Sequence, residues 1–118
     1  MKLQASLIRA SLLTALAFGC DATQNETTPP ARALVIAEPT VVEASCGECQ
    51  FGMDGEDCDL AVRIDGQSYF VSGTSVDEHG DAHAADGFCN AIRHARVTGH
   101  TEGRTFVAET FELLPAGR

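Results

Sequence analysis

The sequence predicts a mainly β domain with one short helix, arranged as a small five-stranded OB-like barrel. Three observations support this fold class. Apolar and polar residues alternate in several short segments, an Asp-Gly pair separates two of them, and a segment with helical spacing precedes the last two. The resulting order is three strands, one helix and two strands. A β-sandwich or an α+β fold with a single sheet is the alternative, because both accept this order.

The first strand is expected over residues 34–42. Apolar residues occupy positions 34–36 and 41–42, with Pro39 between them. Because proline has no N–H to donate to a strand ladder, we expect a break or bulge at this position.

The second and third strands are predicted to form a hairpin. Leu60, Val62 and Ile64 alternate with small or polar residues, which indicates a strand with one buried face. Asp65-Gly66 follows and tolerates the positive φ angles of a type I′ turn. Residues 68–72 should therefore pair back antiparallel.

The helix and the last two strands follow a polar loop over residues 73–80. Small and apolar residues recur at helical spacing from Ala84 to Ala95, which predicts a short helix that Asp81 or Asp86 could cap. Strands are expected at 95–99 and 107–113, joined by a turn. The helix would plug one end of the barrel.

Residues 1–19 have the three zones of an export signal. A basic start with Lys2 and Arg9 precedes an apolar stretch at 10–18 and the small residue Gly19. The apolar stretch is far shorter than the ~20 residues of a spanning helix. Residues 16–20 resemble the lipobox of bacterial lipoproteins, in which the cysteine is acylated. We therefore predict a lipoprotein signal peptide over 1–19 and lipidation of Cys20.

The predicted domain organisation follows from this signal. Residues 20–32 comprise the lipidated cysteine and a flexible polar tether, and residues 33–118 form a single small β-rich domain. We expect the protein in the cell envelope, held by lipid to the inner or outer membrane. The domain would face the periplasm or the cell exterior, with the lipid bilayer as its partner through Cys20.

The net charge of the chain limits the classes of partner that it is expected to bind. Seventeen acidic residues oppose eight basic ones, so the net charge is −9. Nucleic-acid binding depends on basic side chains that neutralise phosphates, and this chain would repel them. A cation or a basic partner suits the charge better. The sequence does not identify a protein or small-ligand partner.

Four cysteines remain once Cys20 is assigned to lipid: Cys46, Cys49, Cys58 and Cys89. An even number in a small exported domain indicates two disulfides, without fixing their pairing. Bonds between Cys46 and Cys58 and between Cys49 and Cys89, for instance, would contribute about 3 and about 4 kcal/mol. These values matter in a domain whose net stability is only ~5–15 kcal/mol.

A metal site is the alternative explanation. The four cysteines, together with the candidate ligands His79, Asp81 and His83, offer more donors than a zinc or copper ion needs. The ligand spacing of zinc fingers is absent. Asp81 would serve either as a ligand or as a group that orients a histidine.

A third explanation is thiol–disulfide exchange at the C-x-x-C pair of Cys46 and Cys49. We do not expect the pair to open a helix after a strand as in thioredoxin-like proteins, because an acidic, glycine-containing loop follows it. No hydrolase, metalloprotease or phosphate-binding motif occurs. We therefore expect no catalytic residues, no enzyme activity and, in the disulfide form, no cofactor.

Five segments carry a resemblance to a known group. They are CGEC at 46–49, CDLAVRIDG at 58–66, HGDAHA at 79–84, GFCNAIR at 87–93 and FELLP at 111–115. Together they resemble an uncharacterised family of small exported bacterial proteins, a domain of unknown function. The resemblance implies one compact domain whose chemical centre comprises the four cysteines with His79, Asp81 and His83. On the residues, we predict a membrane-tethered binding or interaction module stabilised by disulfides.

Overall fold

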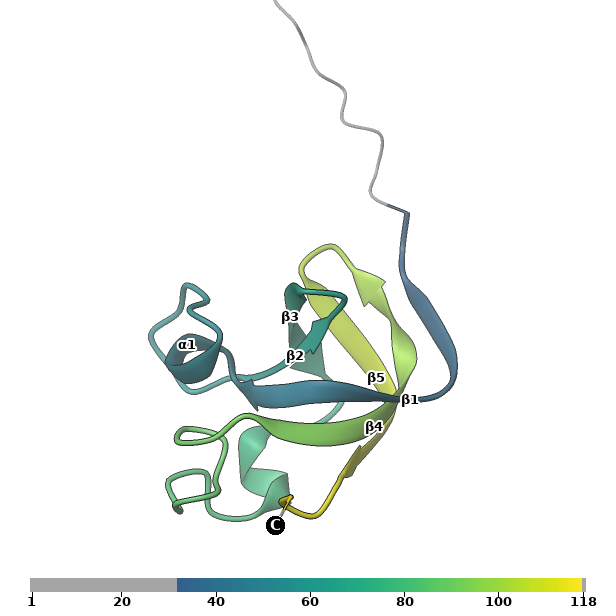
Figure 1. Ribbon diagram of the computed structural model, residues 1–118. Helices are drawn as coiled ribbons and strands as arrows, with labels where there is room; N and C mark the ends of the chain where they lie inside the picture. Colours follow the sequence, from purple (N-terminus) through teal and green to yellow (C-terminus); the bar gives the residue numbers. More distant parts are fainter. Residues whose placement is uncertain (1–31, 118) are drawn as a thin grey trace, which may run out of the picture.

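Five β-strands form a closed barrel in the computed structural model, which describes residues 32–117 (Figure 1). The elements in chain order are β1 (Val35–Cys46), α1 (Gly47–Gln50), β2 (Leu60–Ile64), β3 (Gln67–Ser72), the 3-10 helix η1 (Val76–His79), β4 (Arg93–Glu102) and β5 (Thr105–Leu113). The predicted signal peptide, Cys20 and all but the last residue of the predicted tether lie outside the described residues. No helix within residues 32–117 combines the length and the apolar character needed to cross a membrane.

The strands follow one another around the barrel in the order β1-β2-β3-β5-β4, and β4 closes on β1. Neighbouring strands are antiparallel except β3 and β5, which are parallel. This order, with its parallel pair, is that of an OB-like barrel. The predicted fold class is confirmed, and the β-sandwich and single-sheet alternatives are not observed.

Strand β1 contains the predicted irregularity. Its register against β4 shifts between Ile36 and Thr40, on either side of Pro39. The strand also continues past its predicted end at Val42 as far as Cys46 and pairs with β2 over its last residues. As a result, the first cysteine of the cluster is fixed by a strand ladder.

The hairpin of β2 and β3 is confirmed in detail. Ile64 pairs with Gln67 across the turn, and Asp65 and Gly66 have φ angles of 50° and 82°. Two positive values at the central positions are the mark of a type I′ turn, whose twist matches that of the strands.

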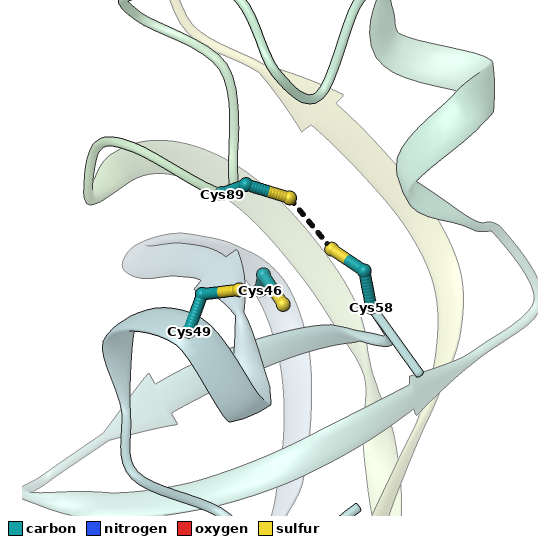
Figure 2. Close-up of side chains that lie close together, drawn as sticks. All are labelled: Cys46, Cys49, Cys58 and Cys89. Atoms are coloured by element: carbon teal, nitrogen blue, oxygen red, sulfur yellow. Dashed lines mark hydrogen bonds between the residues drawn. The ribbon is translucent and has the colours of Figure 1, made fainter. Parts of the chain in front are cut away.

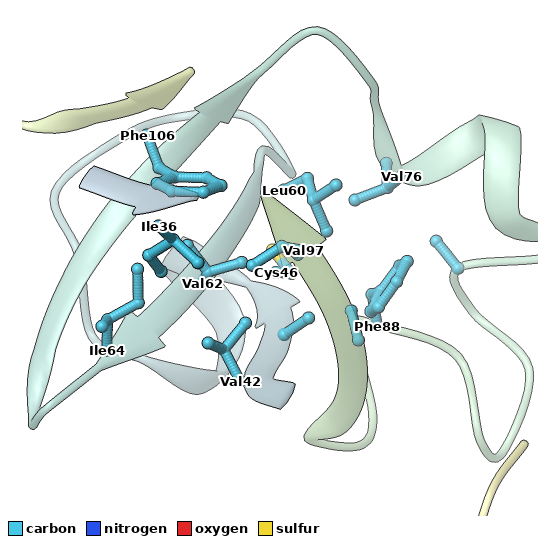
Figure 3. Packing of buried hydrophobic residues seen from close by; sticks show 13 residues of the cluster. Ile36, Val42, Cys46, Leu60, Val62, Ile64, Val76, Phe88, Val97 and Phe106 are labelled. Atoms are coloured by element: carbon cyan, nitrogen blue, oxygen red, sulfur yellow. The ribbon is translucent and has the colours of Figure 1, made fainter. Parts of the chain in front are cut away.

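The hydrophobic core fills the barrel and extends beyond one end of it (Figure 3). Phe106, Val62 and Val97 are fully buried inside the barrel. Val76, Ala82 and Phe88 come from the segment between β3 and β4 and belong to the same cluster. This segment therefore closes the end of the barrel that the helix was predicted to close.

The predicted helix over 84–95 is wrong. Residues 80–92 form a series of turns, and Ala95 already lies in β4. Gly87 permits these turns, because a Cβ there would collide with the carbonyl oxygens of Asp81 and Ala82. The helical spacing instead reflects the burial of Phe88 from a folded loop and of Ala95 from β4.

Candidate metal centre

Four cysteines from three distant segments meet beside the barrel (Figure 2). Cys46 ends β1, Cys49 lies in α1, Cys58 precedes β2, and Cys89 lies in the loop before β4. Contrary to the expectation from the sequence, the C-x-x-C pair therefore does open a helix after a strand, although this helix has only four residues. All four Sγ atoms lie within 4.8 Å of one another. Within residues 32–117, this is the one group of side chains of metal-ligand type that the fold brings together.

The spacing of the sulfurs suits a tetrahedral ion. Zinc–sulfur bonds of ≈ 2.3 Å in a tetrahedron place sulfurs about 3.8 Å apart. The shortest separation described here is 2.8 Å, between Cys58 and Cys89. An ion would therefore require these two side chains to separate by about 1 Å, which a change of side-chain torsion can supply.

The four cysteines are free thiols in this structure. The 2.8 Å between the Sγ atoms of Cys58 and Cys89 exceeds the ≈ 2.05 Å of a disulfide bond. The two disulfides expected from the sequence are therefore not formed here.

The turn that carries Cys49 also fixes the segment that carries Cys58. The backbone N–H of Gly47 donates to the carbonyl oxygen of Asp59 at 2.8 Å. The Glu48 carboxylate accepts the backbone N–H of Asp59 at 3.0 Å. Because Asp59 follows Cys58 directly, these two bonds hold Cys58 against α1.

The same turn fixes the loop that carries Cys89. The side-chain amide of Gln50 donates to the carbonyl oxygen of Cys89 at 2.8 Å. The backbone N–H of Cys46 donates to the carbonyl oxygen of Phe88 at 3.0 Å. Hydrogen bonds therefore hold the peptide groups that precede and follow Cys89.

Ser45 anchors this loop from inside the protein. Its hydroxyl is fully buried and lies 2.6 Å from the carbonyl oxygen of Phe88 and 2.8 Å from that of Ala91. The single hydroxyl proton is shared between these two acceptors. The loop is thereby attached to the end of β1 on either side of Cys89.

Ser45, Glu48 and Gln50 were not identified from the sequence. The sequence marks these three residues only by their position, since each is a polar residue directly next to Cys46 or Cys49 in the run S-C-G-E-C-Q. Polar residues that flank a ligand commonly orient it or its neighbours, so this run could have indicated them.

The exposure of the four cysteines varies. Cys46 is completely buried at the end of β1, and Cys58 and Cys89 are partly exposed. Cys49 is exposed to solvent. The cluster therefore opens to solvent on the side of Cys49.

Burial and crowding oppose ionisation within the cluster. Burial raises the pKa of the Cys46 thiol. The pKa of the Cys58 thiol is also raised, first by burial and then by its hydrogen bonds and charge repulsion with the Cys46 and Cys89 sulfurs. In addition, the Cys46 thiol donates a hydrogen bond to the Glu48 carboxylate, which lies 3.4 Å from Cys46 Sγ. A cation would reverse this balance, because it stabilises thiolates.

The histidine motif lies apart from the cysteine cluster. His79 Nε2 lies 2.8 Å from Thr74 Oγ1, and the imidazole ring packs against Phe88 and Phe111. Asp81 Oδ1 accepts the backbone N–H of His83, whose side chain is exposed. The structure thus brings the four predicted cysteines together and does not bring His79, Asp81 or His83 to them.

Comparison with known proteins identifies a family. The family whose sequence model matches residues 40–114 is described as a family of unknown function (DUF6370). The match includes all four clustered cysteines. No curated protein and no solved structure matches the chain.

Proposed function

Because the chain belongs to the DUF6370 family, whose description gives no activity, we propose a function from the site geometry. The domain binds a thiophilic metal ion through Cys46, Cys49, Cys58 and Cys89. Zinc is the first candidate, since four thiolates in a tetrahedron are a common zinc site. Copper(I) is the second, because it also prefers thiolate ligands.

The observation that carries this proposal is the convergence of four sulfurs within 4.8 Å. Packing alone gives no reason for it, since Cys49 is exposed and contributes little to a core. Hydrogen bonds donated by Gly47 and Gln50 and accepted by Glu48 fix the two other cysteine-bearing segments against α1. A site whose ligands are held before the ion arrives has less conformational entropy to lose on binding.

A disulfide between Cys58 and Cys89 is a second candidate state. Their Sγ atoms are the closest pair, at 2.8 Å, and both side chains are partly exposed. An oxidising compartment would favour this bond. In that state one disulfide would stabilise the binding module, where the sequence predicted two, and two thiols would be left.

The place of this activity follows from the predicted signal. We propose that lipid on Cys20 holds the domain at a membrane of the cell envelope, without enzyme activity and without nucleic acid as a partner. The support is the order of basic, apolar and small residues before Cys20 and the net charge of −9.

Metal titration of the reduced protein tests the proposal. One zinc ion per chain should bind, and cobalt(II) in its place should give the charge-transfer and ligand-field bands of a tetrahedral thiolate site. Replacing Cys58 or Cys89 by serine should weaken binding and shift these bands. The double variant His79→Ala/His83→Ala is the matched control and should bind as the wild type does.

Two results would contradict the proposal. Four alkylatable thiols with no bound metal at micromolar zinc would exclude the site. Loss of binding in the histidine variant, with full cobalt binding but no thiolate charge-transfer band in the cysteine variants, would assign the ion to His79 and His83 instead.

A further inference from the structure

The barrel closes through contacts that lie mostly outside the cysteine cluster. Its strand ladders close it, and its core contains thirteen buried residues. Of the four cysteines, only Cys46 is one of these thirteen, while Cys58 and Cys89 pack against them from partly buried positions. Structural zinc sites supply folding free energy to domains that lack a sufficient core, and this domain has its own.

The ligands are also positioned without an ion. The segments that carry Cys58 and Cys89 are attached to the end of β1 and to α1 by backbone groups, Ser45, Glu48 and Gln50. None of these bonds involves a sulfur of Cys58 or Cys89. Removing an ion from the cluster would therefore leave the loops in place.

Access to the cluster is greatest at Cys49. Cys46 is fully buried, Cys58 and Cys89 are partly exposed and Cys49 is exposed, so an ion held by all four sulfurs would be most accessible to solvent beside Cys49. Asp57 and Asp59 flank Cys58 and are exposed, as are Asp54 and Glu56 in the same loop. This acidic loop attracts cations toward the opening.

From these three observations we infer that the ion is exchangeable cargo, which is loaded and released past Cys49 by ligand exchange with a thiolate-bearing acceptor. The inference rests on the proposed function. In the exchange, the bond from the ion to Cys49 Sγ breaks as a bond to the acceptor's sulfur forms. The Cys49 thiolate takes up the proton that the acceptor thiol has released, and no electrons are transferred. The remaining three ligands follow in the same way.

Zinc transfer from the loaded full chain to a small dithiol chelator tests the inference. The transfer rate should rise in proportion to the dithiol concentration, because the acceptor takes part in the rate-limiting step. The metal-free chain should keep the far-UV and near-UV circular dichroism of the loaded chain. Cys49→Ser and Cys58→Ser form a matched pair, since each keeps three thiolates.

The two variants should differ in rate. Cys49→Ser opens the ion on its accessible side, so transfer should be several-fold faster than in Cys58→Ser. If zinc binds, three results would overturn the inference. They are equal transfer rates in the two variants, a transfer rate that does not depend on the dithiol concentration, and an unfolded metal-free chain. A wild-type chain that binds no zinc would instead overturn the proposed function.

Discussion

Replacing Ser45 by alanine should loosen the loop that carries Cys89 and weaken metal binding. The hydroxyl is fully buried and serves the carbonyl oxygens of Phe88 and Ala91. In the variant, the carbonyl oxygen of Phe88 still accepts a hydrogen bond from the backbone N–H of Cys46, whereas the carbonyl oxygen of Ala91 loses the hydroxyl donor of Ser45. A buried acceptor left without a donor costs about 1–3 kcal/mol. Because the hydrogen bond to Ala91 is only partly buried, the metal-free protein should lose stability toward the lower end of this range.

The effect on metal affinity follows from the same free energy. If the loop is no longer held before the ion arrives, binding must supply the ordering that Ser45 provided. Since 1.4 kcal/mol corresponds to a factor of ten, the dissociation constant for zinc should rise by about fivefold to a hundredfold. Urea denaturation of the metal-free protein and competition with a chelator of known affinity measure the two quantities.

Thr101→Ala provides the matched control for this prediction. Thr101 is buried near the opposite end of β4 from Arg93, and its hydroxyl oxygen accepts the backbone N–H of Leu34 at 2.8 Å. This variant should lose comparable stability with no change in zinc affinity. If Ser45→Ala lowers stability and leaves the dissociation constant unchanged, the claim that the protein holds Cys89 in place before binding is refuted.

Three further predictions concern charge, pH and packing. Glu48→Gln should tighten zinc binding by several-fold, because it removes a negative charge 3.4 Å from Cys46 Sγ; chelator competition measures this. The metal-free protein should lose stability as the pH rises above about 9.0. Burial raises the pKa of Cys58 above that value, so the folded state holds its proton more tightly than the unfolded state; thermal melts across pH measure this. Gly47→Ala should cost about 1–3 kcal/mol in a urea denaturation, since a Cβ there would lie 2.8 Å from Phe70 Cε1.

Each of these three has a contrasting result. Weaker zinc binding in Glu48→Gln would mean that the carboxylate serves mainly to hold Asp59, to which it is hydrogen-bonded. A melting temperature that stays constant at alkaline pH would contradict the assigned direction of the Cys58 shift. Gly117 faces open space, so Gly117→Ala should leave stability unchanged where Gly47→Ala lowers it.

Much of the barrel could be predicted because its signals are local. The alternation of Leu60, Val62 and Ile64 and the following Asp-Gly pair define a hairpin within a dozen neighbouring positions. Pro39 likewise marks a bulge through its missing N–H. In each case the physical cause lies in the residues themselves.

The segment before β4 could not be predicted from such signals. Helical spacing from Ala84 to Ala95 also arises when a loop buries Phe88 at one point and enters a strand at another. Gly87, which approaches two carbonyl oxygens too closely to carry a side chain, reports a tertiary constraint that periodicity does not contain. Tertiary contacts therefore override the helical pattern.

The candidate site was predicted in part. The residue types were enough to single out Cys46, Cys49, Cys58 and Cys89, but not to separate them from the histidine motif. That separation depends on the path of the loop over residues 80–92, which places His79 against Phe88 and Phe111. The supporting bonds of Ser45 and Gln50 depend on the same path.

The course of β1 separates the cysteines from the point at which an anchored chain would enter the domain. The described chain joins β1 at Val35, and the strand ends at Cys46 (Figure 1). Twelve residues at about 3.3 Å each give a strand of up to about 40 Å, less the shortening caused by its bulge and curvature. A lipid attached upstream of Val35 would therefore be joined to the domain at the end of this strand opposite to the thiols. The point of attachment would then leave the opening beside Cys49 free to meet proteins that diffuse through the surrounding compartment.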